Sequence, residues 1–217
     1  ERAWREIDRP HRSLQLEEIL DGIVQRGLKG NISVKPTQVG LEIGKEFFKE
    51  NLRPLLDRAR DKDVLVRWDM ESSEWTQPTL DAFEELWAEG YQNMGVVLQS
   101  YLRRTMTDAR RMNELGVRVR LCKGAYVEPP EVAFQDKAEV DRNYVEVSEV
   151  LLKEGVYPAL ATHDDLIIET LKAFATREGI GSERFEFQML HGVRAHFASG
   201  KTLSHTTQTL GSLYLNR

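Results

Sequence analysis

The sequence predicts an α/β fold in which parallel strands alternate with helices. Six short apolar runs occur along the 217 residues, and stretches with helical periodicity lie between them. Alternation of strand and helix is typical of a parallel sheet with right-handed crossovers. A polar residue lies at or near the carboxyl end of each run, which indicates where a functional site would form.

Each apolar run has the length of a strand and is flanked by turn residues or charges. The runs are NISVK (31–35), VLVRWDM (64–70), GVVLQS (95–100), VRVRLCK (117–123), YPALAT (157–162) and FEFQML (185–190). We therefore expect a strand in each of these six ranges, with a helix in each gap.

Three of the gaps show the helical pattern most clearly. Their apolar stripes consist of Leu80, Phe83 and Trp87; of Val140, Tyr144, Val147 and Leu151; and of Ile167, Leu171 and Phe174. Gly90 and Gly155 follow the first two stripes as stop signals, and Asp164 precedes the third as a cap.

The polar strand ends favour a barrel over an open, doubly wound sheet. No G-x-G-x-x-G motif and no P-loop follows any run, so the usual nucleotide signals of an open sheet are missing. In a (β/α)8 barrel all strand carboxyl ends converge on one face, which holds the chemistry. The residues at these ends are Lys35, Asp69, Gln99, Lys123, Thr162 with His163, and Gln188. We expect an incomplete (β/α)8 TIM-type barrel of about six β/α units, because a whole barrel takes about 250 residues.

Composition and residue patterns argue against a nucleic-acid partner, an internal disulfide and a metal site. The net charge of −5 argues against a nucleic-acid partner, because phosphate binding requires a basic face. The single cysteine, Cys122, excludes an internal disulfide and fits a reducing, cytoplasmic compartment. The five histidines include no H-E-x-x-H pattern, so we expect no metal site. The charged start ERAWREIDRPHR is not a signal peptide, and no apolar run reaches 18 residues.

The segment RLCKGAY (120–126) is the strongest indication of a ligand-binding site in the sequence. Arg120 lies between Val119 and Leu121 in a predicted strand, so we expect its side chain to face a polar pocket. Gly124 and Ala125 lack side-chain bulk, which lets a flat ligand approach the backbone. A glycine-containing turn after a strand is the simpler alternative.

Other segments suggest partners for such a ligand. The amide of Gln99 suits a ring amide or carbonyl, and Thr162 and His163 lie at a helix N-terminus, which favours an anion such as phosphate. Asp69 is either a loop carboxylate or a functional acid.

Taken together, six motifs resemble those of the flavin-dependent proline dehydrogenases (proline oxidases), in order and spacing, over roughly residues 20–194. They are NISVKPTQVG, VRWDMES, VVLQSYLRRT, VRLCKGAYVEP, ATHD and RFEFQMLHGVR. The resemblance implies a distorted (β/α)8 barrel with FAD over the strand ends. It further implies that L-proline is oxidised to Δ1-pyrroline-5-carboxylate, as C5 loses a hydride to flavin N5, and that a quinone accepts the electrons.

The resemblance also implies a role for each motif residue. Asp69 and Arg120 would be catalytic, and the substrate would lie against Lys35, Tyr126 and Leu190. The cofactor-binding residues would be Met70, Gln99, Arg120, Lys123, Gly124, Ala125, Val127, Thr162 and His163. A cation at Arg120 would stabilise negative charge on reduced flavin, and Lys35 would hold the proline carboxylate. We expect a cytoplasmic protein, and a quinone acceptor would imply that it contacts the inner membrane peripherally.

The sequence departs from the family pattern at both ends. The family's first strand has no counterpart, and the tail AHFASGKTLSHTTQTLGSLYLNR replaces a closing strand and a helix with two adjacent arginines. We expect a barrel domain over 1–194 and an atypical tail over 195–217. Two alternatives stay open: a catalytically impaired fragment that keeps the flavin-site residues and serves as a binding or dimerising module, or another barrel enzyme acting on a phosphorylated small molecule.

Overall fold

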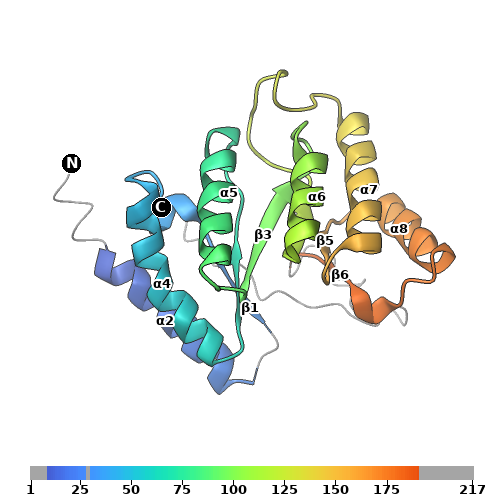
Figure 1. Cartoon of the computed structure of the whole chain (residues 1–217). Coiled ribbons are helices and arrows are strands. Elements are labelled where there is room, and N and C mark those ends of the chain that lie inside the picture. Colours follow the sequence, from blue (N-terminus) through green and yellow to red (C-terminus); the bar gives the residue numbers. More distant parts are fainter. Residues whose placement is uncertain (1–8, 28–29, 191–217) are drawn as a thin grey trace. The chain divides into compact units, whose positions relative to one another are not determined.

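The computed structural model describes residues 9–27 and 30–190 (Figure 1). Within these ranges the strands hydrogen-bond in the order β1-β2-β3-β4-β5-β6. In chain order the elements are α2 (Arg9–Gln25), β1 (Asn31–Val34), α3 (Pro36–Val39), α4 (Lys45–Asp61), β2 (Leu65–Trp68), α5 (Ser73–Ala88), β3 (Met94–Gln99), α6 (Thr105–Leu115), β4 (Arg118–Cys122), α7 (Lys137–Glu154), β5 (Ala159–Ala161), α8 (Asp165–Arg177), the 3-10 helix η1 (Ser182–Arg184) and β6 (Glu186–Gln188).

The predicted alternation of strand and helix is confirmed. Each of the six predicted strands is present, although most are shorter than the apolar run that predicts them. The chain divides into two compact units between Gly95 and Val96, which lie within β3. The two units are described separately.

The first unit is built on the parallel pair β1–β2, with Asn31 opposite Leu65 and Val34 opposite Trp68. Trp68 has no exposed surface and packs edge-on against Phe48 of α4 and Phe83 of α5, with ring centroids 5.0 and 5.1 Å away. This aromatic cluster fixes α4 and α5 on the strands.

The second unit contains β4, β5 and β6, which pair in parallel. Helix α7 packs against both α6 and α8 (Figure 1). The buried Tyr144 of α7 donates its hydroxyl to the Leu121 carbonyl of β4 at 3.2 Å, which ties the helix to the strand. Val119 and Leu121 are buried, whereas Arg118 is exposed and Arg120 is half-buried. Burial therefore alternates along β4, as expected for a strand with one face covered by helices.

The predicted helix boundaries hold where a specific capping residue marks them. Asp164 accepts a hydrogen bond from the Ile167 N–H at the start of α8, at 3.4 Å. Gly155 ends α7, and Gly90 follows the last turn of α5 with φ at +101°. Over the ranges that the structure describes, no helix is both long and apolar enough to cross a membrane.

Candidate functional site

In the first unit the structure brings Lys35 and Asp69 to neighbouring strand ends. Val34 and Trp68 are opposite each other in the β1–β2 pair, and Lys35 and Asp69 are the next residues of the two chains. The Asp69 N–H donates to the Val34 carbonyl at 2.8 Å, which extends the pairing by one residue. Both side chains are half-buried, and Met70 beside them is buried. Lys35 and Asp69 are therefore neighbouring residues at this edge of the sheet.

A buried acid, Glu71, holds this edge together. Its carboxylate accepts from the Thr37 N–H at 2.9 Å and from the Thr37 hydroxyl at 2.7 Å. Helix α3 begins directly after Lys35, and Thr37 lies in its first turn. Glu71 therefore fixes the backbone next to this lysine. Sequence reasoning missed Glu71, although its position two residues after Asp69 was a usable signal.

In the second unit Arg120 has the polar surroundings that the sequence predicts. Its Nε donates to the Gln188 Oε1 at 2.6 Å, and the Gln188 Nε2 donates to the Glu186 carboxylate. Both partners are buried in β6. A guanidinium held in this way stays in one orientation, which suits a cation that must face a reacting group.

Gly124 lacks a side chain for a reason that lies inside the protein. Its φ is +108°, and a Cβ atom there would come within 2.2 Å of the Tyr101 ring. The Tyr101 N–H also donates to the Lys123 carbonyl at 2.9 Å. The interpretation that Gly124 is small for a ligand is therefore incomplete, because the close approach of the buried Tyr101 already requires glycine there. Sequence reasoning did not identify this role of Tyr101.

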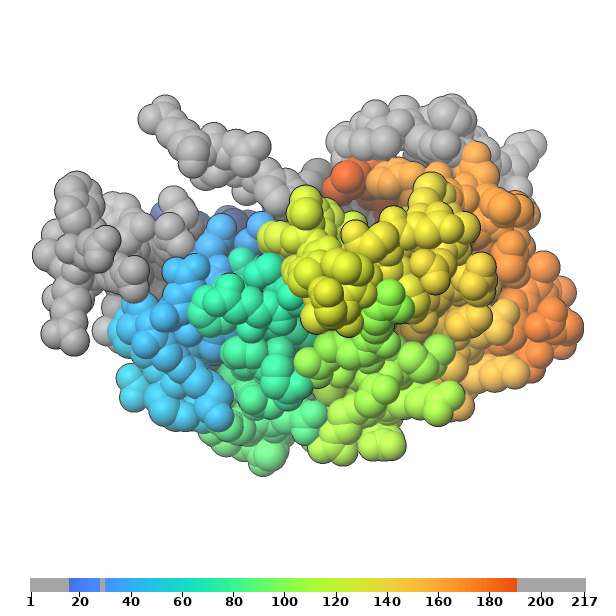
Figure 2. All heavy atoms as spheres, turned by 90° about the horizontal axis from the view of Figure 1, so that it is seen from above, coloured from blue at the N-terminus to red at the C-terminus, as the bar shows by residue number. Residues whose placement is uncertain are grey.

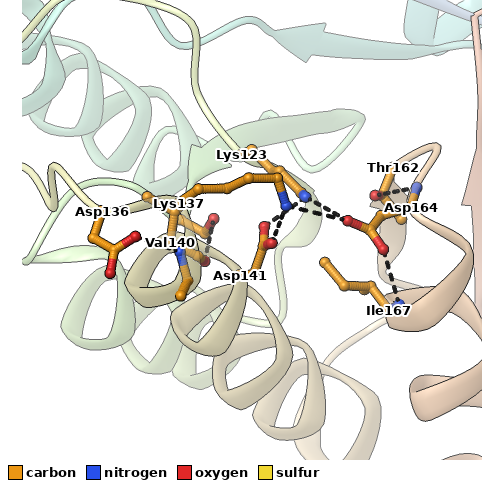
Figure 3. Close-up of polar contacts among 10 residues, drawn as sticks. Lys123, Asp136, Lys137, Val140, Asp141, Thr162, Asp164 and Ile167 are labelled. Atoms are coloured by element: carbon orange, nitrogen blue, oxygen red, sulfur yellow. Dashed lines mark hydrogen bonds and ion pairs between the residues drawn. The ribbon is translucent and has the colours of Figure 1, made fainter.

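Three expected cofactor residues of the second unit, Lys123, Thr162 and His163, follow β4 and β5. Figure 3 shows Lys123 and Thr162. Thr162 is buried, and its hydroxyl oxygen accepts from the Asp164 N–H at 3.1 Å. The Nε2 of His163 accepts from the Leu190 N–H at 3.0 Å. Lys123 pairs with Asp164, so it is linked to the same turn.

The remaining expected residues differ in exposure. Gln99 is buried at the end of β3. Tyr126 and Leu190 are 39% and 58% exposed, and Val127 is fully exposed. The segment that follows Gly124 lies at the surface of the second unit, where yellow-green spheres mark it in Figure 2. Roles that bury these side chains against a ligand stay predictions, and the tail 195–217 lies outside the described residues.

The donor set of the second unit fits a flavin nucleotide. An oriented guanidinium and a buried carboxamide suit the polar edge of an isoalloxazine ring, and a hydroxyl at a helix N-terminus suits a diphosphate. Among the residues for which side chains are described, no cluster of three or more His, Cys, Asp or Glu side chains is arranged to hold a metal ion.

Comparison with known proteins places these residues in a family context. The family model described as Proline dehydrogenase matches residues 2–207. Proline dehydrogenase 2 of Bacillus subtilis (strain 168) is 39% identical over 173 residues, which are 80% of this chain and 57% of that protein. Proline dehydrogenase of Deinococcus radiodurans is 37% identical over 196 residues, covering 87% of this chain and 63% of the relative. The chain thus spans about three fifths of the length of these relatives.

Solved structures agree with the sequence comparisons. Proline utilization A (PutA) from Bdellovibrio bacteriovorus, inactivated by N-propargylglycine, matches with a TM-score of 0.77 and 27% identity over 86% of this chain and 24% of that chain. PutA from Bradyrhizobium japonicum matches with the same TM-score at 24% identity, over 89% of this chain and 23% of that one. The likeness confirms the predicted α/β barrel class.

Proposed function

Since this chain belongs to the proline dehydrogenase family, we propose that the protein oxidises L-proline to Δ1-pyrroline-5-carboxylate with bound FAD as the oxidant. The observation that carries the proposal is Arg120, a half-buried cation within β4 whose guanidinium is oriented by Gln188. Bound FAD would supply the redox chemistry by taking up a hydride from proline C5.

The first unit supplies the groups that would bind the substrate. Lys35 carries a compact positive charge that would pair with the proline carboxylate. Asp69 carries a negative charge that would attract the proline nitrogen. Glu71 keeps the backbone after β1 in place through its two hydrogen bonds from Thr37. Fixing both charges beforehand lowers the entropic cost of orienting the substrate.

The second unit supplies the groups that would hold the cofactor. Arg120 would stabilise the negative charge that develops on the reduced ring, because a preorganised cation acts without reorganisation when charge appears. Gln99 would hydrogen-bond the ring. Thr162 and His163 would contact the nucleotide further out, and the backbone of Lys123, Gly124 and Ala125, with Val127, would line it.

Two electrons must leave the protein before the next turnover. We infer a quinone as the acceptor and, with it, a cytoplasmic protein that contacts the inner membrane peripherally. The family resemblance of the motifs supports both inferences.

A catalytically impaired relative is the second candidate. Such a protein would keep the flavin-binding groups and lack turnover.

The visible absorption spectrum of the purified protein tests both candidates. We expect a flavin spectrum that L-proline bleaches in the absence of oxygen. A flavin spectrum that proline leaves unchanged would support the impaired relative, and a colourless, folded protein would refute both.

The variant Arg120→Met sharpens this test. Losing one preorganised charge should slow bleaching by about a hundredfold or more. Arg118→Met is the matched control, because Arg118 lies on the same strand, is exposed, and stacks over the Tyr157 ring with Cζ 5.5 Å from its centroid. Equal bleaching rates in the two variants would contradict the role of Arg120.

A further inference from the structure

The ammonium group of Lys123 lies between two carboxylates that come from different helices (Figure 3). Its Nζ is 2.5 Å from the Asp141 Oδ1 and 3.0 Å from the Asp164 Oδ2. Lys137 approaches the same two acids, in contact with Asp141 and 3.6 Å from Asp164. The four side chains form a cluster, here called the Lys123 cluster.

The elements of the cluster explain why it is well fixed. Lys123 directly follows β4, Asp141 lies in the second turn of α7, and Asp164 caps α8. Three polar groups of Asp164 are used in this way: Oδ1 accepts from the Ile167 N–H, Oδ2 accepts from Lys123, and the backbone N–H donates to the Thr162 hydroxyl. A continuous chain of contacts therefore runs from the end of β4 to the end of β5.

The charges of the cluster are balanced. The hydrogen bond from Lys123 holds the pKa of Asp164 below its ordinary value despite burial. Burial pushes the pKa of Asp141 upward, but the hydrogen bonds from Lys123 and Lys137 outweigh it, and that pKa is also lowered. Both acids are ionised at neutral pH, so the two lysines and the two acids cancel.

We propose that Asp141 and Asp164 are positioning residues of the flavin site, because they hold the Lys123 side chain and thereby fix the backbone of 123–125 relative to Thr162 and His163. This inference rests on the proposed function. It assigns Lys123 a specific part: its ammonium ties two binding segments of the protein together, while its backbone faces the cofactor.

Two substitutions remove the charge with little change of shape. Asp164→Asn keeps an oxygen that caps α8, so it isolates the ion pair from the cap. Asp141→Asn does the same on α7. Asp136→Asn is the matched control, since Asp136 caps α7 through the Ala138 N–H at 3.0 Å and is exposed.

The measurement is the dissociation constant of FAD, obtained by adding FAD to flavin-stripped protein and following flavin fluorescence. We expect Asp141→Asn and Asp164→Asn each to raise it about tenfold, because each breaks a charge-assisted hydrogen bond. Asp136→Asn should stay within about twofold of wild type, as expected for an exposed acid. If Asp141→Asn does not fold, Asp164→Asn carries the test by itself.

A double-mutant cycle with Lys123→Met separates positioning from general stability. If the acids act through Lys123, adding Asp164→Asn to Lys123→Met should change the dissociation constant by less than about twofold. Additive effects, or variants that bind FAD as well as Asp136→Asn does, would overturn the positioning role alone. A wild-type protein that takes up no FAD would instead refute the proposed function.

Discussion

The ring of Tyr101, which follows β3, requires glycine at position 124, which follows β4. The ring occupies the space of a Gly124 Cβ, and the backbone of Gly124 is in a region that side chains disfavour. We predict that Gly124→Ala lowers the free energy of unfolding by about 2–4 kcal/mol, from backbone strain plus the clash. Urea unfolding followed by circular dichroism measures this loss.

Gly116→Ala separates the two causes. Gly116 also has a positive φ, +75°, but a Cβ there meets nothing within 4 Å. The control should cost about 1 kcal/mol, from strain alone. The explanation by the clash is wrong if the two variants lose equal stability.

At this scale the sequence predicts residues whose surroundings are local. The unusual place of Arg120 between two buried neighbours was enough to predict a polar partner, and Asp164 was identified as a cap from its position before the helix. The partners of Glu71, Tyr101 and Arg120, which are Thr37, Gly124 and Gln188, are all distant in sequence and were not identified. Pattern reasoning compares neighbours along the chain, so it can mark a residue as unusual but does not identify the distant residue that it contacts.

At the scale of elements, α4 and α5 are joined by a charged cluster. Lys49 of α4 is largely buried, and its ammonium contacts Glu85 of α5 and, at 3.0 Å, Glu46. The hydrogen bonds from Lys45 and Lys49 lower the pKa of Glu85, and those from Glu85 and Glu46 raise the pKa of Lys49. The pair is therefore ionised at neutral pH.

Glu85→Gln should destabilise the protein by about 1–2 kcal/mol, because a buried ammonium loses its charged partner. Thermal unfolding at neutral pH measures the effect. Glu89→Gln is the control: Glu89 pairs with the more exposed Arg53 at 2.8 Å, and exposed pairs contribute less than about 1 kcal/mol. A larger loss in the control would argue against burial as the cause.

The six strands and the helices between them follow from apolar runs and helical stripes, so the sequence is sufficient to predict them. Their ends are less predictable. Lys35 was expected in a strand, but it is the cap position of α3, a four-residue helix that no periodicity could reveal. Gln99 and Gln188 are the last residues of β3 and β6, whereas Lys35, Asp69, Lys123 and Thr162 are the first residues after their strands.

At the scale of the whole molecule, the barrel class was predictable because polar residues recur at every strand end. The expected site residues are shared between the units: Lys35, Asp69 and Met70 belong to the first, and the others to the second. A single domain over 1–194 stays a prediction, as does the atypical tail.

Flavin removal should destabilise the whole protein if the proposed function is right. A ligand at about a hundred times its dissociation constant stabilises the folded state by about 2.7 kcal/mol. For a chain of this size the melting temperature should therefore fall by about 5–10 °C when FAD is stripped. Differential scanning calorimetry measures the shift, and equal melting temperatures with and without FAD would contradict bound cofactor.

The double use of Asp164 has a consequence for how related sequences can diverge. Asparagine or serine would preserve the helix cap but lose the charge, and glutamate would keep the charge but cap poorly. Aspartate alone meets both demands while Lys123 is present. If the lysine is replaced in a related protein, any capping residue can occupy position 164. Positions 123 and 164 are therefore expected to covary among related sequences.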